Sequence, residues 1–256
     1  MHLFADIAAG FANISLLQIL LVAAVTLFAS VVGGVAGYGT GALMPLVLVP
    51  MVGAEPVVPI IAISALFTNT GRIAAFFREV DFRRALIVIA GAVVTCMLGA
   101  YGYSQLTGVG AALVIGTMLI LSVPLRRLAR RRDLRLGDRG LAAGAAGYGL
   151  LVGGTTGSGV ILLTLLMAAG LQGAAVVATD AAITIAVGIV KVVVFGMAGV
   201  VTAQVIAFGL LIGIVAFPGG FLAKMLFERM PVHIHTAMLD AVVIVGGLTM
   251  IASTLR

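Results

Sequence analysis

The stretch at 31–50, VVGGVAGYGTGALMPLVLVP, places the turn-forming residues 37–41 inside a run that is otherwise apolar. A similar interruption returns at 151–170, LVGGTTGSGVILLTLLMAAG. Glycine weakens a helix because it loses more backbone freedom on folding than any other residue. We therefore predict a broken helix at each place, followed by a short apolar helix at 42–52 or 160–170.

The composition predicts a protein that lies in a membrane. Of the 256 residues, 62% are hydrophobic and only 9% are charged, with a mean hydropathy of +1.27. This is too little polar surface to cover a water-soluble globule. Uncharged runs of roughly 20 residues, enough to cross a bilayer core, follow one another, whereas barrel strands would alternate apolar and polar residues. The sequence predicts an all-α integral membrane protein.

The positive charge is concentrated in one segment. The net charge is +6, and RRLARRRDLRLGDR at 126–139 holds seven of the fifteen lysines and arginines. Cytoplasmic loops of membrane proteins carry such an excess, so we expect this loop in the cytoplasm and do not expect a nucleic-acid partner. Counting spans back from the loop places the N-terminus outside. The loop separates two transmembrane regions, 1–125 and 140–256.

The two regions are related by an internal repeat. Residues 33–106 align without gaps on 153–226, and six pairs of glycines coincide, against about two expected from random placement. Each copy is expected to have about five membrane segments, including a broken or re-entrant hairpin. An odd number of crossings between the copies inverts the second one, as in many transporters. The remaining expected helices are about 14–35, 57–77, 84–105 and 109–125 in the first copy and 140–154, 174–196, 203–226 and 233–254 in the second.

The short helices are expected to build an anion site. At about 1.5 Å per residue each spans roughly half of the hydrocarbon core, so its glycine-rich tip lies deep in the membrane. The unpaired N–H groups and the positive dipole end at each tip suit an anion, and hydroxyls add donors. An alternative is that the glycines only allow close helix packing and the hydroxyls cap the helices. The candidate substrate-binding residues at the tips are Gly37, Tyr38, Gly39, Thr40 and Gly41, and Thr155, Thr156, Gly157, Ser158 and Gly159.

Charged residues inside the predicted spans are further candidates. Arg72 and Lys191 lie toward opposite ends of equivalent spans, where each could draw anions into a vestibule, or could extend its charge to the membrane surface. Asn69 shares the helix of Arg72, where it could line the same path or, equally, form only a hydrogen bond between packed helices. Asp180 and Asp240 are candidates either for proton coupling or for an ion pair with Arg72.

Sequence motifs argue against catalysis. The residues two before and two after Ser158 are Thr156 and Val160, which do not match a GxSxG nucleophile motif. Neither tip is followed by the Gly-Lys-Ser/Thr of a P-loop. Cys96 is the only cysteine, which excludes a disulfide within the chain and a site with several cysteine ligands. We expect no enzymatic activity, no cofactor and no bound metal.

The glycine-rich break followed by proline in GGVAGYGTGALMPLVLVP, its echo GGTTGSGVILLTLLMAAGL and the later AVVATDAAITIAVGIVK resemble the sulfite exporter TauE/SafE family. The resemblance covers about residues 15–254. It implies a multi-pass protein of the bacterial inner membrane that transports sulfite or organosulfonates, often outward. We predict a secondary transporter with alternating access around a midplane site. An uncoupled anion channel and, less favoured, a membrane-embedded enzyme remain alternatives, and a homodimer and proton coupling remain open.

Overall fold

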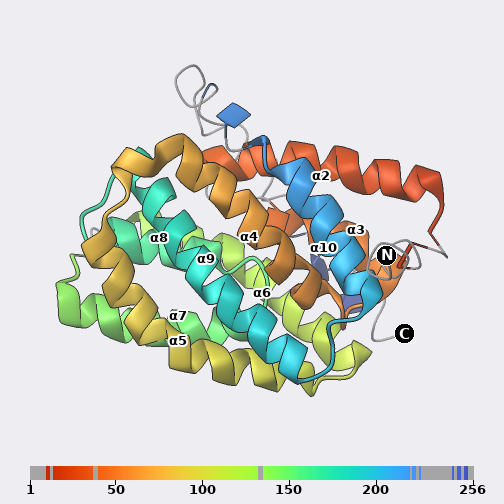
Figure 1. Cartoon of the computed structure of the whole chain (residues 1–256). Coiled ribbons are helices and arrows are strands. Elements are labelled where there is room, and N and C mark those ends of the chain that lie inside the picture. The colour runs from red at the N-terminus through yellow and green to blue at the C-terminus, as the bar shows by residue number, and fades with distance from the viewer. Residues whose placement is uncertain are drawn as a thin grey trace.

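A computed structural model describes residues 10–11, 14–36, 40–131, 135–219, 221, 222, 225, 244, 247, 248, 251 and 252 (Figure 1). All regular elements in this described part are helical, as the sequence predicts. In chain order they are α2 (Leu16–Ala36), α3 (Thr40–Val52), α4 (Val57–Phe76), the 3-10 turn η1 (Phe77–Glu79), α5 (Phe82–Ser104), α6 (Gly108–Arg131), α7 (Asp138–Gly154), α8 (Gly159–Ala168), α9 (Ala174–Met197) and α10 (Ala203–Ala216).

Both predicted short helices are present. Helix α3 has 13 residues and α8 has 10, so they measure about 20 Å and 15 Å, less than the hydrocarbon thickness of about 30 Å. In the second half, the non-helical segment 155–158 separates α7 from α8. In the first half, α2 ends at Ala36 and α3 begins at Thr40, while Gly37, Tyr38 and Gly39 lie outside the described residues.

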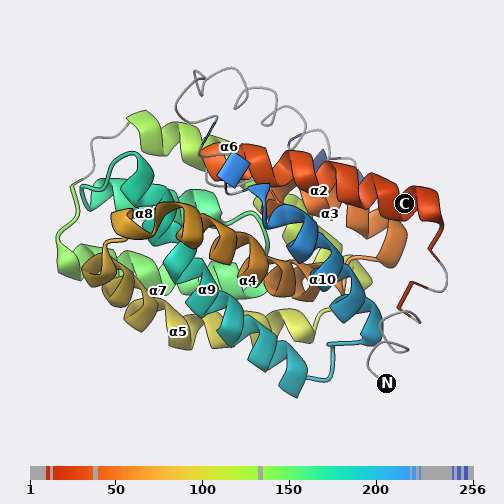
Figure 2. The same ribbon diagram turned by 45° about the horizontal axis from the view of Figure 1, so that its top comes forward.

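Helices α4 and α9 form the centre of the bundle and run antiparallel. A Cβ added to Gly188 of α9 would lie 2.9 Å from the Leu66 side chain of α4. Further along α4, Arg72 instead faces Asp180 of α9. Rising residue numbers on one helix therefore meet falling numbers on the other. In Figure 2 this central pair lies between α5 and α7 on one side and α2, α3 and α10 on the other.

The contacts around this centre are repeated in the two halves. In the register of the sequence repeat, α2 to α5 correspond to α7 to α10. Helix α5 packs on α7 and on α9, and its counterpart α10 packs on α2 and on α4. Exchanging the halves therefore maps these contacts onto one another. Since α4 and its counterpart α9 are antiparallel, these equivalent helices run in opposite directions.

Two helix boundaries differ from the sequence prediction. Helix α6 continues through Arg131, so the first arginines of 126–139 belong to its last turns and not to a loop. Arginine favours helix, and a cluster of charges marks the end of an apolar span without ending the helix itself. Helix α10 ends at Ala216, and the described residues 219, 221, 222 and 225 are helical again. The predicted span 203–226 is therefore interrupted at 217–218, because Pro218 cannot donate a backbone hydrogen bond. Most of the predicted helix 233–254, with Asp240, lies outside the described residues.

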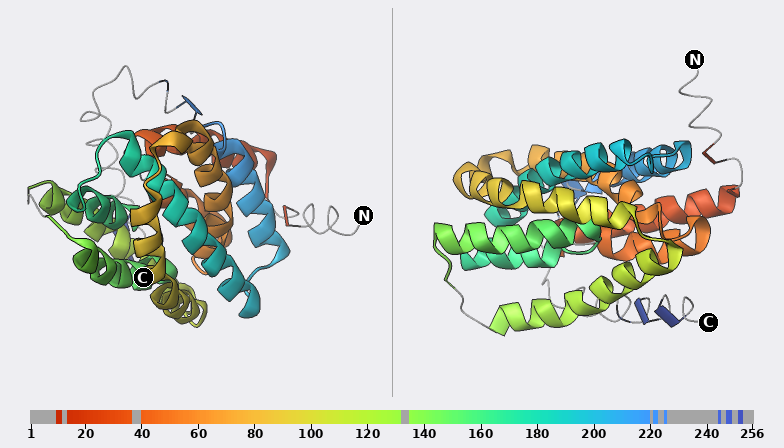
Figure 3. Two further views of the ribbon diagram at one scale, coloured as in Figure 1. Left: turned by 60° about the vertical axis from the view of Figure 1, so that its left-hand side comes forward. Right: turned by 90° about the horizontal axis from the view of Figure 1, so that it is seen from below.

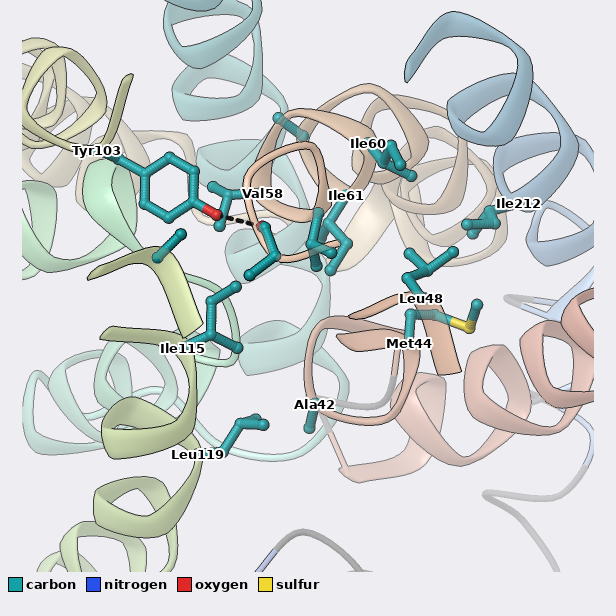
Figure 4. Packing of buried hydrophobic residues seen from close by; sticks show 14 of the residues in the cluster. Ala42, Met44, Leu48, Val58, Ile60, Ile61, Tyr103, Ile115, Leu119 and Ile212 are labelled. Atoms are coloured by element: carbon teal, nitrogen blue, oxygen red, sulfur yellow. Dashed lines mark hydrogen bonds between the residues drawn. The ribbon is translucent and has the colours of Figure 1, made fainter. Parts of the chain in front are cut away.

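Helix α3 is held in a buried apolar environment. Its residues Met44 and Leu48 are fully buried, and they lie near Ile60 of α4 in Figure 4. The same view shows Ile115 of α6 in this cluster, and the Tyr103 hydroxyl donates a 2.7 Å hydrogen bond to the Ala54 carbonyl oxygen. The right-hand view of Figure 3 shows α6 along one edge of the bundle. This packing places the start of α3 inside the protein.

The outer surface suits a lipid environment. Three described segments are long and apolar enough to cross a membrane: Val57–Glu79, Phe82–Ser104 and Ala174–Met197. Large apolar side chains such as Leu86, Val94 and Leu98 of α5 are exposed. A contiguous apolar surface of this kind is unfavourable in water and favourable against acyl chains.

Candidate functional site

A cavity of about 100 Å³ lies between α4, α7, α9 and the two helix breaks. Most of the site residues predicted from the sequence line this cavity, although they are spread over more than 150 positions of the chain. The nominated residues that line the cavity are Thr40, Gly41, Asn69, Arg72, Thr155, Thr156, Gly157, Ser158, Gly159, Asp180 and Lys191. The nominated residues Gly37, Tyr38, Gly39 and Asp240 lie outside the described part of the chain.

The two glycine-rich breaks meet at this cavity. The Thr156 hydroxyl donates a 2.6 Å hydrogen bond to the carbonyl oxygen of Gly41. A Cβ on Gly41 would lie 3.3 Å from the backbone nitrogen of Gly157, closer than most real Cβ contacts. Gly157 has φ +80°, a conformation that favours glycine. Glycine is therefore favoured at Gly41 by the close approach of the two tips and at Gly157 by the backbone conformation of the turn.

The start of α8 presents unpaired donors to the cavity. Within the described residues, no backbone carbonyl accepts a hydrogen bond from the N–H of Gly157, Ser158 or Gly159. The first N–H groups of a helix have no partner inside the helix, and they carry the positive end of its dipole. This arrangement favours a negatively charged ligand.

The threonine hydroxyls at the second tip have a different role from the one the sequence suggests. The Thr155 hydroxyl donates to the Leu151 carbonyl oxygen at 2.8 Å, and the Thr156 hydroxyl donates to Gly41. A hydroxyl has one proton, so neither is left as a donor to an anion in this geometry. Ser158 does not cap α8 through its side chain, contrary to the capping alternative. Its hydroxyl is therefore the better placed donor.

Lys191 is buried at the broken end of α7. The residue is only 5% exposed, and its Nζ donates hydrogen bonds to the carbonyl oxygens of Val152 at 2.7 Å and Thr155 at 3.1 Å. These carbonyls belong to the last turn of α7 and to its C-cap residue, where no later N–H of the helix pairs with them. An ammonium has three donors, so one N–H remains for a ligand. The ammonium is therefore held inside the protein and does not reach its outer surface.

Arg72 and Asp180 form a buried ion pair at another part of the cavity wall. The residues are 4% and 2% exposed, and Arg72 Nη1 lies 3.7 Å from Asp180 Oδ2. Arg72 Nη1 also donates to Asn69 Oδ1 at 3.3 Å. Within the described residues, Arg72 Nε and Asp180 Oδ1 have no hydrogen-bond partner. Arg72 and Lys191 therefore line one shared cavity, whereas their positions in the sequence predict two separate vestibules.

The cavity also contains residues that were not nominated as site residues. Tyr148 of α7 is almost fully buried and lines the wall together with Thr184 of α9. Thr184 shares a helix face with Asp180 and Lys191, which the spacing of four and seven residues predicts. Tyr148 lies in the segment AAGYGLL, which is otherwise made of small or aliphatic residues. A single large polar ring in such a segment was the one feature of the sequence that could have indicated Tyr148 as a site residue.

Comparison with known families identifies the chain. The profile described as Sulfite exporter TauE/SafE matches residues 22–250, nearly the whole chain. The chain belongs to the sulfite exporter TauE/SafE family. TauE/SafE proteins are membrane transporters of sulfur-containing anions, which agrees with the apolar helices and with the expectation of a protein that is not an enzyme. Comparisons with curated proteins and with solved structures found no match. The matched range contains every cavity residue named above.

Proposed function

We propose that this TauE/SafE protein is a secondary transporter that exports a small sulfur-containing oxyanion, sulfite or an organosulfonate. The observation that carries the proposal is the meeting of the two helix breaks at a cavity lined by two buried cations, Arg72 and Lys191. Buried cations are costly unless they are compensated, and only one carboxylate, Asp180, lines the cavity among the described residues. An anionic ligand supplies the missing negative charge.

The donors at the second tip match the chemistry of a sulfite or sulfonate group. Such a group has three oxygen atoms that accept hydrogen bonds. The start of α8, the Ser158 hydroxyl, the remaining N–H of Lys191 and the guanidinium of Arg72 are the donors that we assign to the bound anion. The cavity of about 100 Å³ is well below the size of typical drug-sized pockets, which favours a small ligand.

The arrangement of the halves supports alternating access. We propose two inverted repeats of about five membrane segments each, which expose the cavity first to one side and then to the other. Antiparallel α4 and α9 provide the contact across which the halves would move. We also propose that the protein lies in the bacterial inner membrane, with the N-terminus outside and the basic segment 126–139 in the cytoplasm.

A binding panel on the purified protein tests the ligand class. Isothermal titration calorimetry compares sulfite and sulfoacetate with acetate and with the zwitterion taurine. We expect sulfite and sulfoacetate to bind more tightly than acetate and taurine. Lys191→Met should raise the Kd for sulfite and sulfoacetate at least tenfold, since a hydrogen bond to a charged group contributes about 1.5–3 kcal/mol. Arg83→Met is the matched control, because Arg83 is an exposed cation paired with Asp138 away from the cavity. Equal affinities in both variants would remove the cavity from consideration as the binding site.

A counterflow experiment distinguishes the transporter from the channel alternative. Liposomes containing the protein are loaded with unlabelled sulfoacetate and diluted into a trace of labelled sulfoacetate, with the membrane potential clamped at zero. A carrier that exchanges anions accumulates label transiently above the external concentration, whereas a channel only equilibrates it. The recovered label is checked by chromatography, and a new chemical product would favour the enzyme alternative.

A further inference from the structure

The ion pair between Arg72 and Asp180 is incomplete in a way that bears on transport. The contact is a single one at 3.7 Å, longer than a good charged hydrogen bond, and each partner keeps one buried polar atom without a hydrogen bond among the described residues. Buried ion pairs are favourable only when the geometry is good and the remaining donors and acceptors are satisfied. This pair is therefore held weakly enough for another anion to compete for the guanidinium.

The competition has a consequence for Asp180. Both residues line the cavity, so an anion that contacts Arg72 takes the place of the carboxylate. An ionised carboxylate that is buried without a partner is costly, and it is relieved most directly by binding a proton. Anion binding at Arg72 and proton binding at Asp180 are then one coupled event.

In the part of the chain that the structure describes, no second carboxylate lies on the cavity wall beside Asp180. The charged or titratable groups on the elements packed against α9 are Arg72 of α4, Asp138, Arg139 and Tyr148 of α7, Arg83, Arg84, Cys96, Tyr101 and Tyr103 of α5, and Arg78 and Glu79 of η1, with Asp81 immediately before α5. Lys191 lies on α9 itself and is engaged by the carbonyls of α7. Among the described residues, Asp180 is the one acidic residue that lines the cavity.

We propose that Asp180 is the proton-binding residue of this transporter, and that one proton crosses the membrane with each anion. A doubly charged anion and its proton together carry one negative charge, so a membrane potential that is negative inside drives their exit, in agreement with the proposed export. The proton enters from the aqueous phase on the side where the anion binds and adds to a carboxylate oxygen of Asp180 as the anion takes Arg72. On the other side the anion leaves, Asp180 releases the proton to water, and the carboxylate returns to Arg72. No covalent bond of the anion is made or broken. This inference rests on the proposed function and specifies its coupling ion.

The test is accumulation driven by a pH difference in liposomes that contain the full-length protein. The probe is labelled sulfoacetate, whose two acidic groups both stay ionised between pH 6 and 7, so that any co-transported proton is carried by the protein. Potassium and valinomycin hold the membrane potential at zero, with pH 6 outside and pH 7 inside. One coupled proton then drives accumulation to about tenfold, since one pH unit corresponds to a factor of ten in the proton gradient.

Three variants separate coupling from structure. Asp180→Asn keeps the shape but cannot bind the proton, and we expect its accumulation ratio to stay near one while exchange of labelled for unlabelled sulfoacetate continues. Asp180→Glu keeps a carboxyl group and is expected to retain accumulation. Asp138→Asn removes an exposed carboxylate that pairs with Arg83, and it should behave like the wild type.

The outcomes are distinguishable. A wild-type ratio near one with active exchange overturns the coupling and leaves the transporter proposal intact. A wild-type protein that neither exchanges nor binds sulfite or sulfoacetate overturns the proposed function and the coupling with it. Accumulation by Asp180→Asn equal to that of the wild type also overturns the role of Asp180. The wild-type ratio decides the coupling by itself, and the ratios of Asp180→Asn and Asp180→Glu, measured with variants that elute as folded protein, decide whether Asp180 carries the proton.

Discussion

Substitution of Gly157 by alanine is the sharpest test of whether the glycine-rich tips bind the anion or only permit packing. Gly157 has φ +80°, and a Cβ there would lie 3.3 Å from Cδ2 of Leu119 and 3.6 Å from the carbonyl oxygen of Gly41. The first contact is tight and the second is ordinary. Alanine is therefore resisted mainly by the backbone conformation, and relief of that strain would turn the N–H groups at the start of α8 away from the cavity.

The expected magnitudes for stability and for binding differ. A non-glycine residue held at such a φ costs about 1–3 kcal/mol, which corresponds to a melting temperature lower by roughly 2–12 °C for a protein of this size. Loss of the hydrogen bond from one aligned N–H to the anion weakens binding by about 1.5–3 kcal/mol, which raises the Kd about 10- to 150-fold.

Gly199→Ala is the matched control. Gly199 has φ +72° in the turn after α9, and a Cβ there meets no atom within 4 Å. It therefore carries a comparable backbone cost away from the cavity. We expect similar melting temperatures for the two variants in detergent, and a raised Kd for sulfite by calorimetry in Gly157→Ala alone. Equal Kd values in the two variants would refute the argument that this tip binds the ligand and would assign its glycines to packing.

Three further outcomes follow from the structure. Gly153→Ala places a Cβ 2.2 Å from a backbone carbonyl oxygen of α5 and should lower the melting temperature by several degrees. Gly147→Ala is the control on the same helix. Its Cβ meets no atom within 4 Å, so the melting temperature should stay the same or rise slightly. Arg72→Ala leaves a buried carboxylate unpaired at a cost of about 3–5 kcal/mol, and the double variant with Asp180→Asn should recover part of the folded yield in size-exclusion chromatography. The Asp81 side chain caps α5 by accepting a hydrogen bond from a backbone N–H, and this hydrogen bond is the main cause of the lowered pKa of the Asp81 carboxyl. The cap contributes about 1 kcal/mol to the free energy of unfolding. This contribution is complete above the ordinary pKa of 3.8 and is lost as the pH falls through the lower pKa of the folded protein. The difference in melting temperature between wild type and Asp81→Ala should therefore narrow below about pH 4, and a constant difference down to pH 3 would contradict this.

The helices were predictable where a local signal marks them. The predicted 57–77 and 84–105 correspond to Val57–Phe76 and Phe82–Ser104, because apolar runs, prolines and charges mark these ends. Prediction was wrong at the end of α6, where arginines continue the helix, because the end of the helix and the end of the membrane span were taken to coincide. The predicted helix 203–226 is interrupted after α10, at Pro218, and the described residues beyond it are helical again.

The candidate site was predictable in its members and less so in its contacts. The repeat and the cost of charge in lipid pointed to the tips and to Arg72, Asp180 and Lys191. The hydrogen bonds of Thr155 and Thr156 to carbonyl groups were not foreseeable, since a hydroxyl in a sequence does not show which acceptor it will face. The cavity wall formed by Tyr148 was missed for the same reason.

Residue order alone was enough to establish an all-helical membrane protein, its internal duplication and its two short helices, because apolar length, glycine and charge act within a few neighbouring residues. Folding in three dimensions was needed to bring Gly41 against Gly157, Arg72 against Asp180, and Lys191 onto the end of α7. These contacts join residues separated by about forty to more than one hundred positions, and they depend on how whole helices pack. No local preference of the chain encodes them, and together they create the cavity from which we infer anion transport.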